Sequence, residues 1–265
     1  MDMPTRTVLA LGKLDARPFK EMVAWLRWVP GVQLVSDEQI GGNEPFDLLI
    51  LCSERPGQFT PREIELLRHR YPLATVVLLY GPWCHGEGRT GPVPDGVVRV
   101  AWFEWSYRLP SLLEVGPLVP ATATPQEQLL GALADRFGTQ HSRQVGIWAN
   151  TWDDFDYLRS ACQSLGYASI WLQSDPQSPC DILLGLIPGT DGAEFADLQA
   201  RLAAHAEQLA LVCLATPTWE DYQKLRSTGV SAVLGQPFRL ADLANLLETR
   251  SDCGILPLVN PQGSR

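Results

Sequence analysis

Short apolar runs recur along the chain, and longer stretches with apolar residues at helical spacing separate them. Runs of this kind predict strands buried on both faces, while the longer stretches predict helices with one apolar side. In the first part of the chain the predicted strands are 7–11, 32–35, 47–52, 75–80 and 97–101. Strands that alternate with helices at short spacing indicate a parallel sheet covered on both faces.

Capping chemistry locates the predicted helices of this part. We expect Asp15 to cap a helix whose apolar positions include Phe19 and Leu26, and Thr60-Pro61 to start a second one as N-cap and first residue. A closing helix is expected to include 109–113. Between the fourth and fifth strands, residues 81–96 contain five Gly and three Pro, which predicts a loop in place of a helix.

The same pattern begins again at Arg143. The predicted strands are 145–149, 168–172, 181–186, 209–214 and 231–234, and the predicted helices are 152–165, 191–206, the segment that Thr218 caps, and the segment around 240–247. The strands DLLILC and DILLGL begin at corresponding places in the two halves. The chain therefore reads as a tandem repeat of one five-stranded unit.

The segment 209–247 has turn chemistry at each junction. Thr218 is a natural N-cap with Asp221 three residues later, and Gly229 suits the position after a helix end. Gln236 and Pro237 then follow the last predicted strand, and Pro237 blocks its regular continuation.

This segment resembles the last third of a response-regulator receiver (CheY-like) domain. Receivers end their fifth strand with Lys-Pro, seven residues after a Gly that closes the fourth helix, and here Gly229 precedes Gln236-Pro237-Phe238 at that spacing. The resemblance covers most of 143–249 and, with fewer matching features, 5–115. It implies two flavodoxin-like α/β units, each a five-stranded parallel sheet of order 2-1-3-4-5 with helices on both faces.

The resulting domain prediction has four parts. Residues 1–115 and 143–249 are degenerate receiver-like domains, 116–142 is a linker with a short helix, and 250–265 is a C-terminal tail. A single sheet running through both halves would contradict this organisation.

The resemblance also implies where a receiver would hold its phosphorylation site. A receiver places an acidic pair after its first strand to hold Mg²⁺, an acceptor Asp after the third, a hydroxyl after the fourth and a Lys after the fifth. In the second unit these positions fall on Ala149, Asn150, Leu186, Ala215 or Thr216, and Gln236, which precedes Pro237. In the first unit the acceptor position falls on Cys52 and the acidic pair lies near Gly12-Lys13.

These replacements remove the chemistry that such a site needs. Mg²⁺ prefers carboxylate oxygens, and a phosphoryl group brings negative charge that a cation must neutralise. An amide such as Gln236 supplies no positive charge. Asp153, Asp154 and Asp156 come too late in the chain and read as acids of a first helical turn. We therefore expect neither a metal nor a cofactor at these positions.

The leading hypothesis is a non-enzymatic signalling or scaffold protein of two pseudo-receiver domains that acts by protein–protein contact. The candidate contact residues are Trp83, Cys84, His85 and Arg89, in the 81–96 loop, and Phe238. The alternative is a small-ligand binder or thiol-dependent enzyme, because Cys52, Cys84 and His85 could converge at the carboxyl edge of the first sheet.

Composition and charge limit the classes of partner molecule that the chain is expected to bind. The net charge is −9, of which residues 121–265, with 9 Lys+Arg and 16 Asp+Glu, contribute −7. The absence of a basic stripe argues against nucleic acid and for protein partners, such as two-component or other signalling proteins, and leaves a homodimer open. Six scattered cysteines without a CxxC motif, no long apolar run and no signal-peptide pattern predict a reduced, cytoplasmic protein without a membrane span.

Overall fold

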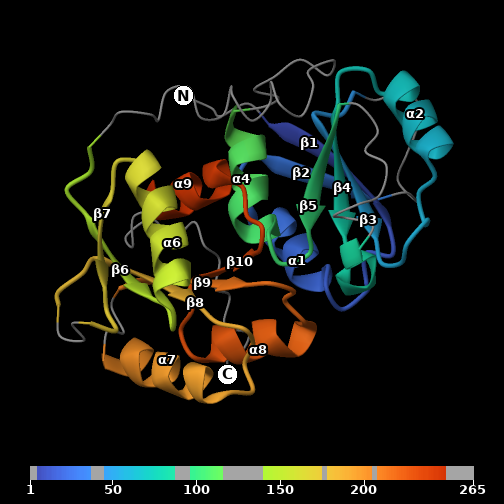
Figure 1. Cartoon of the computed structure of the whole chain (residues 1–265). Helices are drawn as coiled ribbons and strands as arrows, with labels where there is room; N and C mark the ends of the chain where they lie inside the picture. The colour runs from blue at the N-terminus through green and yellow to red at the C-terminus, as the bar shows by residue number, and fades with distance from the viewer. Residues whose placement is uncertain are drawn as a thin grey trace, which may run out of the picture. The chain divides into compact units, whose positions relative to one another are not determined.

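The computed structural model describes residues 5–36, 45–86, 96–115, 140–174, 178–204 and 208–248. The chain divides into two compact units, 1–131 and 132–265, which we call unit 1 and unit 2 and describe separately (Figure 1). Within the described ranges, no helix is both long enough and apolar enough to cross a membrane.

Unit 1 contains a five-stranded parallel sheet of order β2-β1-β3-β4-β5. Its strands are β1 (Arg6–Gly12), β2 (Val32–Ser36), β3 (Leu48–Ser53), β4 (Thr75–Tyr80) and β5 (Val97–Ala101). Its helices are α1 (Lys20–Trp28), α2 (Pro61–Arg70) and α4 (Trp105–Val115), with the short 3₁₀ helix η2 (Pro82–Cys84) after β4. The predicted fold class is confirmed for this unit.

Unit 2 repeats the arrangement, with the parallel order β7-β6-β8-β9-β10. Its strands are β6 (Gln144–Trp148), β7 (Ala168–Trp171), β8 (Ile182–Leu186), β9 (Leu209–Leu214) and β10 (Ala232–Gly235). Its helices are α6 (Trp152–Ser164), α7 (Ala193–Ala204), α8 (Trp219–Ser227) and α9 (Leu240–Glu248). Both units thus have strand order 2-1-3-4-5 in the sequence of their own strands.

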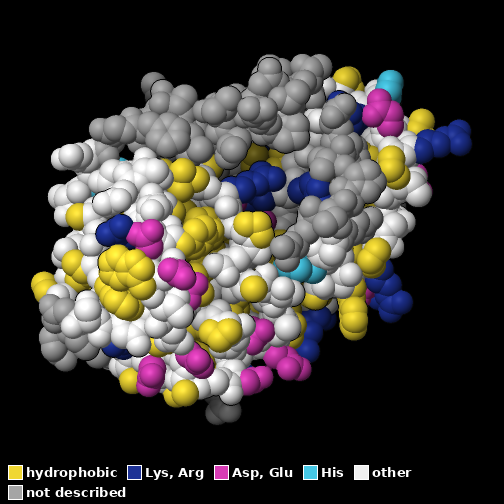
Figure 2. Space-filling model, viewed as in Figure 1, with side chains coloured by type: hydrophobic (Ala, Val, Ile, Leu, Met, Phe, Trp, Pro, Cys, Tyr) yellow, Lys and Arg dark blue, Asp and Glu magenta, His cyan; other side chains and the backbone are white. Residues whose placement is uncertain are grey.

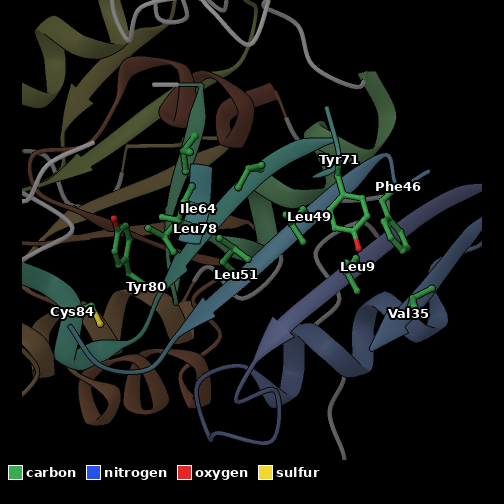
Figure 3. Packing of buried hydrophobic residues seen from close by; sticks show 12 residues of the cluster. Leu9, Val35, Phe46, Leu49, Leu51, Ile64, Tyr71, Leu78, Tyr80 and Cys84 are labelled. Atoms are coloured by element: carbon green, nitrogen blue, oxygen red, sulfur yellow. The ribbon is translucent and has the colours of Figure 1, made fainter. Parts of the chain in front are cut away.

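The core of unit 1 shows why its strands are apolar throughout. Leu49 and Leu51 of β3 pack with Leu78 of β4 and Ile64 of α2 on one face of the sheet (Figure 3). The intervening Ile50 points to the opposite face and is equally buried, because successive side chains in a strand alternate. Helices therefore have to cover both faces, as they do in Figure 1.

Two predicted features of unit 1 need correction. Asp15 does not cap α1, because residues 13–19 form hydrogen-bonded turns and the helix begins at Lys20 with Phe19 as its N-cap. The segment after β4 is not a bare loop, since it starts with η2, whose Cys84 is fully buried. The rest of that segment, 87–95, lies outside the described residues. So do residues 116–139 of the predicted linker and the whole predicted C-terminal tail.

The predicted caps of α2 and α8 are confirmed. Thr60 and Glu63 form a capping box at α2, and Thr218 and Asp221 form one at α8. Gly229 follows α8 with a φ of +92°, a left-handed conformation that glycine adopts without strain. Local sequence chemistry therefore sets these helix ends.

Asp221 does more than cap α8. It also accepts hydrogen bonds from the backbone N–H of Thr190, at 3.2 Å, and from the hydroxyl of this buried residue in the loop between β8 and α7. Partial burial acts to raise the pKa of Asp221, but the hydrogen bonds from Thr190 and Thr218 outweigh it and hold the pKa below its ordinary value. One carboxylate thus joins the loop before α7 to the first turn of α8.

We predict that this carboxylate makes unit 2 sensitive to acid. Because the folded-state pKa is depressed, the stabilisation is fully present above the unfolded Asp pKa of about 3.9 and is lost as the pH falls through the folded value. In urea denaturation, Asp221→Asn should be less stable than the parent chain at neutral pH, and the difference should shrink below about pH 4. Asp197→Asn, at an exposed carboxylate of α7, is the matched control, and a difference that does not change with pH would contradict the prediction.

Candidate functional site

The carboxyl ends of the parallel strands meet at one edge of each sheet, where open α/β folds place their binding residues. In unit 1 the strand register sets Gly12 of β1 beside Cys52 of β3, and Cys52 beside Leu79 of β4. The positions that the resemblance assigned to an acidic pair and to an acceptor Asp are therefore neighbours in space. Their side chains decide what this edge can bind.

Gly12 leaves no room for a side chain. Its φ is +99°, and a Cβ built at this position would lie 2.4 Å from the carbonyl oxygen of Cys52, well inside van der Waals contact. An aspartate here would meet both a strained backbone and this carbonyl. The backbone itself, and not only the residue type, is unsuited to a metal-binding carboxylate at residue 12.

The next residue places a cation at this edge. Lys13 Nζ lies 3.2 Å from the carboxylate of Glu54, two residues beyond Cys52. Receiver chemistry would need free carboxylates at the end of the first strand to hold Mg²⁺. Here the residue is a lysine, and it is already paired with Glu54.

Both cysteines of unit 1 are buried, but their side chains do not converge: Cys84 packs in the cluster of Leu51, whereas Cys52 follows Leu51 along β3 and points to the opposite face of the sheet. Cys84 donates its Sγ hydrogen to the carbonyl oxygen of Ser53 at 3.3 Å, next to Cys52 in the chain. Burial raises the pKa of the Cys52 thiol to about 12, so it is protonated at neutral pH. A nucleophilic cysteine needs the opposite shift, which speaks against the thiol-dependent alternative.

The candidate contact residues after β4 differ in exposure. The side chain of Trp83 is 76% exposed, whereas Cys84 is fully buried and His85 is half-buried. Cys84 therefore packs in the core and cannot contact a partner in this conformation. Arg89 lies outside the described residues.

In unit 2 the corresponding edge is apolar. Leu186 of β8 pairs with Cys213 of β9. Ala149 directly follows Trp148 of β6, whose register partner Gly185 directly precedes Leu186. Ala149 is fully buried, and its carbonyl oxygen accepts a hydrogen bond from Trp171 Nε1 at 3.0 Å. A tryptophan thus contacts the position where a receiver would carry an acid.

The remaining predicted positions of unit 2 lie along the same edge. Asn150, Ala215 and Thr216 are exposed, and Gln236 is half-buried with its backbone N–H bonded to the carbonyl oxygen of Leu214 at 2.7 Å. Pro237 follows through a cis peptide bond. This edge therefore carries neutral side chains at each of the assigned positions.

Sequence reasoning missed an aromatic cluster beside this edge. Trp152 and Phe155 of α6 and Trp171 of β7 lie with ring centroids 5.2 to 5.5 Å apart. Phe238, a predicted contact residue, lies 5.6 Å from the ring of Tyr157, also on α6. The spacing of Trp152 and Phe155 suggests a shared helix face, but nothing in the sequence reveals that Trp171 joins them.

Asp153 and Asp154 are first-turn acids of α6, as expected, whereas Asp156 lies beyond the first turn and forms an ion pair with Arg159. Asp154 accepts a hydrogen bond from the hydroxyl of Thr151, whose oxygen caps the helix. Within the described ranges, no group of three His, Cys, Asp or Glu side chains is arranged to hold a metal ion.

Receiver domains are among the solved structures to which the chain is similar. The chain is similar to the signal receiver domain of a modulated diguanylate cyclase from Desulfovibrio desulfuricans G20, with 21% identity over 40% of this chain and 90% of that one, at a TM-score of 0.34. It is also similar to the receiver domain of an HD domain-containing protein from Pseudomonas fluorescens Pf-5, with 14% identity over 40% and 92% of the two chains, at a TM-score of 0.34.

A longer match is to the C-terminal part of Escherichia coli RcsC, which contains a linker region and a phosphoreceiver domain. It has 16% identity over 92% of this chain and 91% of that one, at a TM-score of 0.34. No protein-family model matches the chain, and no curated protein matches it. The order and direction of the strands in the two sheets assign both units to the flavodoxin-like fold.

We predict that Gly12 is required for the edge of unit 1 to form. Gly12→Ala should destabilise the chain more than Gly57→Ala, because Gly57 also has a positive φ but has open space around its Cβ position. The left-handed conformation alone should cost about 1–2 kcal/mol at Gly57, and the contact with the Cys52 carbonyl adds to this at Gly12. Urea denaturation of both variants measures the difference, and equal losses would refute the role of the contact.

Proposed function

We propose that the protein is a non-enzymatic signalling or scaffold protein of two pseudo-receiver units that acts through contact with other proteins. Both units have lost the acceptor Asp, the acidic Mg²⁺-binding pair and, in unit 2, the Lys after the fifth strand. Phosphorylation therefore does not switch them. The partners are signalling proteins of the cytoplasm, and neither a cofactor nor a metal takes part.

One observation supports this proposal above the others. The register brings Gly12 beside Cys52 in unit 1 and sets the residue before Ala149 beside the residue before Leu186 in unit 2, and none of these positions of a phosphorylation site carries a carboxylate. Lys13 adds a cation, paired with Glu54, where a receiver would gather negative charge for Mg²⁺. Because these positions offer neither an acceptor nor a metal site, we infer that the units act through contacts of their surfaces with other proteins.

The segment after β4 is the proposed contact surface of unit 1. Its Trp83 side chain projects from η2, which the buried Cys84 anchors against Ser53. Tryptophan on an anchored segment can give a large contact area with little further loss of side-chain entropy. Because Cys84 belongs to the core, replacing the whole segment would disturb folding as well as contact.

Incubation with acetyl phosphate and Mg²⁺ should leave the mass of the intact protein unchanged. The position of the Asp that would accept the phosphoryl group is occupied by Cys52 in unit 1 and by Leu186 in unit 2. A receiver domain that is known to be phosphorylated serves as the positive control in the same reaction. A Mg²⁺-dependent gain of one phosphoryl group on the protein would overturn the proposal.

The Trp83 surface can be tested without removing Cys84. Trp83→Ala should leave the thermal midpoint within a few degrees of the parent value and reduce partner recovery in an affinity pull-down quantified by mass spectrometry. Trp28→Ala is the matched control, because Trp28 is the other strongly exposed tryptophan described in unit 1, at 84% exposure. Undiminished recovery with Trp83→Ala would exclude this surface.

A further inference from the structure

Two large aromatic side chains of unit 2 are exposed on a single helix. Trp152 is 53% and Tyr157 is 45% exposed, and both lie in the first half of α6. Figure 2 shows hydrophobic side chains at the surface over the region where Figure 1 draws α6 and β7, with acidic side chains beside them. Folding leaves part of both rings in water, and an exposed apolar area of this kind is typical of a contact surface.

The ring of Trp152 is held in place by contacts with two other aromatic rings. It contacts the buried ring of Phe155 at 5.2 Å and the ring of Trp171 at 5.5 Å, and Phe155 and Trp171 stack at 5.3 Å. Trp171 is in turn fixed by its hydrogen bond to the Ala149 carbonyl oxygen. A partner would therefore meet a tryptophan that is already positioned, which lowers the entropy cost of binding.

The aromatic rings already attract a cation from within the chain. The guanidinium carbon of Arg159 lies 5.6 Å from the centroid of the Trp152 ring and 5.7 Å from that of Phe155. Arg159 also forms an ion pair with Asp156. This internal contact shows which chemistry the rings accept, namely a planar cation that is paired with a carboxylate.

The negative charge of the carboxylates near the aromatic rings is only partly neutralised by cations of the described residues. Asp153, Asp154 and Asp156 lie on the first turns of α6, and Arg159 forms an ion pair with Asp156. Asp154 is engaged with Thr151, whereas Asp153 is exposed and has no ion-pair or hydrogen-bond partner among the described residues. Since residues 121–265 carry a net charge of −7, the wider field also favours a basic partner.

We propose that this α6 surface, formed by Trp152, Asp153, Asp156, Tyr157 and Arg159, docks a segment of a partner protein in which Arg or Lys alternates with apolar residues. A cation of the partner lies against Asp153 and the exposed part of the Trp152 ring. An apolar side chain packs beside Tyr157, which Phe238 supports at 5.6 Å. This inference rests on one part of the proposed function, namely that unit 2 acts by contact with other proteins.

The test uses the full chain and a synthetic probe. Binding of a short fluorescent peptide of repeating Arg-Leu dipeptides is measured by anisotropy, with the Glu-Leu counterpart as the charge-reversed probe. We expect the Arg-Leu peptide to bind and the Glu-Leu peptide not to bind. The affinity for the Arg-Leu peptide should fall as salt is added, because exposed charges are screened.

Matched variants locate the binding. Trp152→Ala and Asp153→Asn should each raise the Kd about tenfold, as is typical for an anchoring residue. Trp28→Ala, which removes an exposed tryptophan of unit 1, and Asp197→Asn, which removes an exposed acid of α7, should leave the Kd unchanged. Asp153 is at the surface, so its variant keeps the test valid if Trp152→Ala fails to fold.

Equal binding by the parent chain, Trp152→Ala and Asp153→Asn would overturn the inference, as would equal binding of the two peptides. A loss that Asp197→Asn shares would also overturn it, because it would show attraction to the overall negative charge alone. None of these results concerns phosphorylation. A phosphoryl gain in the acetyl phosphate reaction would instead overturn the proposed function, so the two failures are distinguishable.

Discussion

Burial of every central strand on both faces is the constraint on which both units depend. A parallel strand such as β3, in which each residue is buried, cannot leave either side of its sheet in water, so helices must cover both sides. Connections between parallel strands then return each strand in the same direction. Their carboxyl ends therefore gather at one edge, which makes that edge the natural place for a functional site.

The two units fill that edge in different ways. In unit 1 the backbone of Gly12 approaches the Cys52 carbonyl too closely for a side chain, and Lys13 pairs with Glu54. In unit 2 the edge is closed by the apolar pair Ala149 and Leu186, and an indole lies against it. The same topology thus accommodates a charged edge and an aromatic edge, so the fold alone does not decide the chemistry.

Local patterns predicted the elements well, because strand burial and helix capping leave signals within a few residues. The strands 75–80, 97–101 and 209–214 begin and end where the sequence predicted, and Thr60 and Thr218 cap the helices assigned to them. The start of α1 was misplaced, because Asp15 looks like a cap but stands in a series of turns.

Contacts between distant residues could not be predicted in this way. The hydrogen bond from Trp171 to Ala149, the ion pair of Lys13 with Glu54 and the bonds of Thr190 to Asp221 each join different loops or elements. Apolar periodicity identifies which side of a helix is buried, but it does not identify which side chain it will meet. The aromatic cluster of α6 includes Trp171 of β7, and this contact depends on the pairing of β7 with β6, which the sequence pattern does not reveal.

The bond between Asp221 and Thr190 has a mechanical consequence. Asp221 lies in the first turn of α8, and Thr190 lies in the loop that leads from β8 to α7, so one carboxylate ties this loop to the start of the helix. Any displacement of the loop before α7 away from α8 has to break the hydrogen bonds from Thr190 to Asp221. Loss of this one carboxylate would therefore release the loop and remove half of the helix cap at the same time.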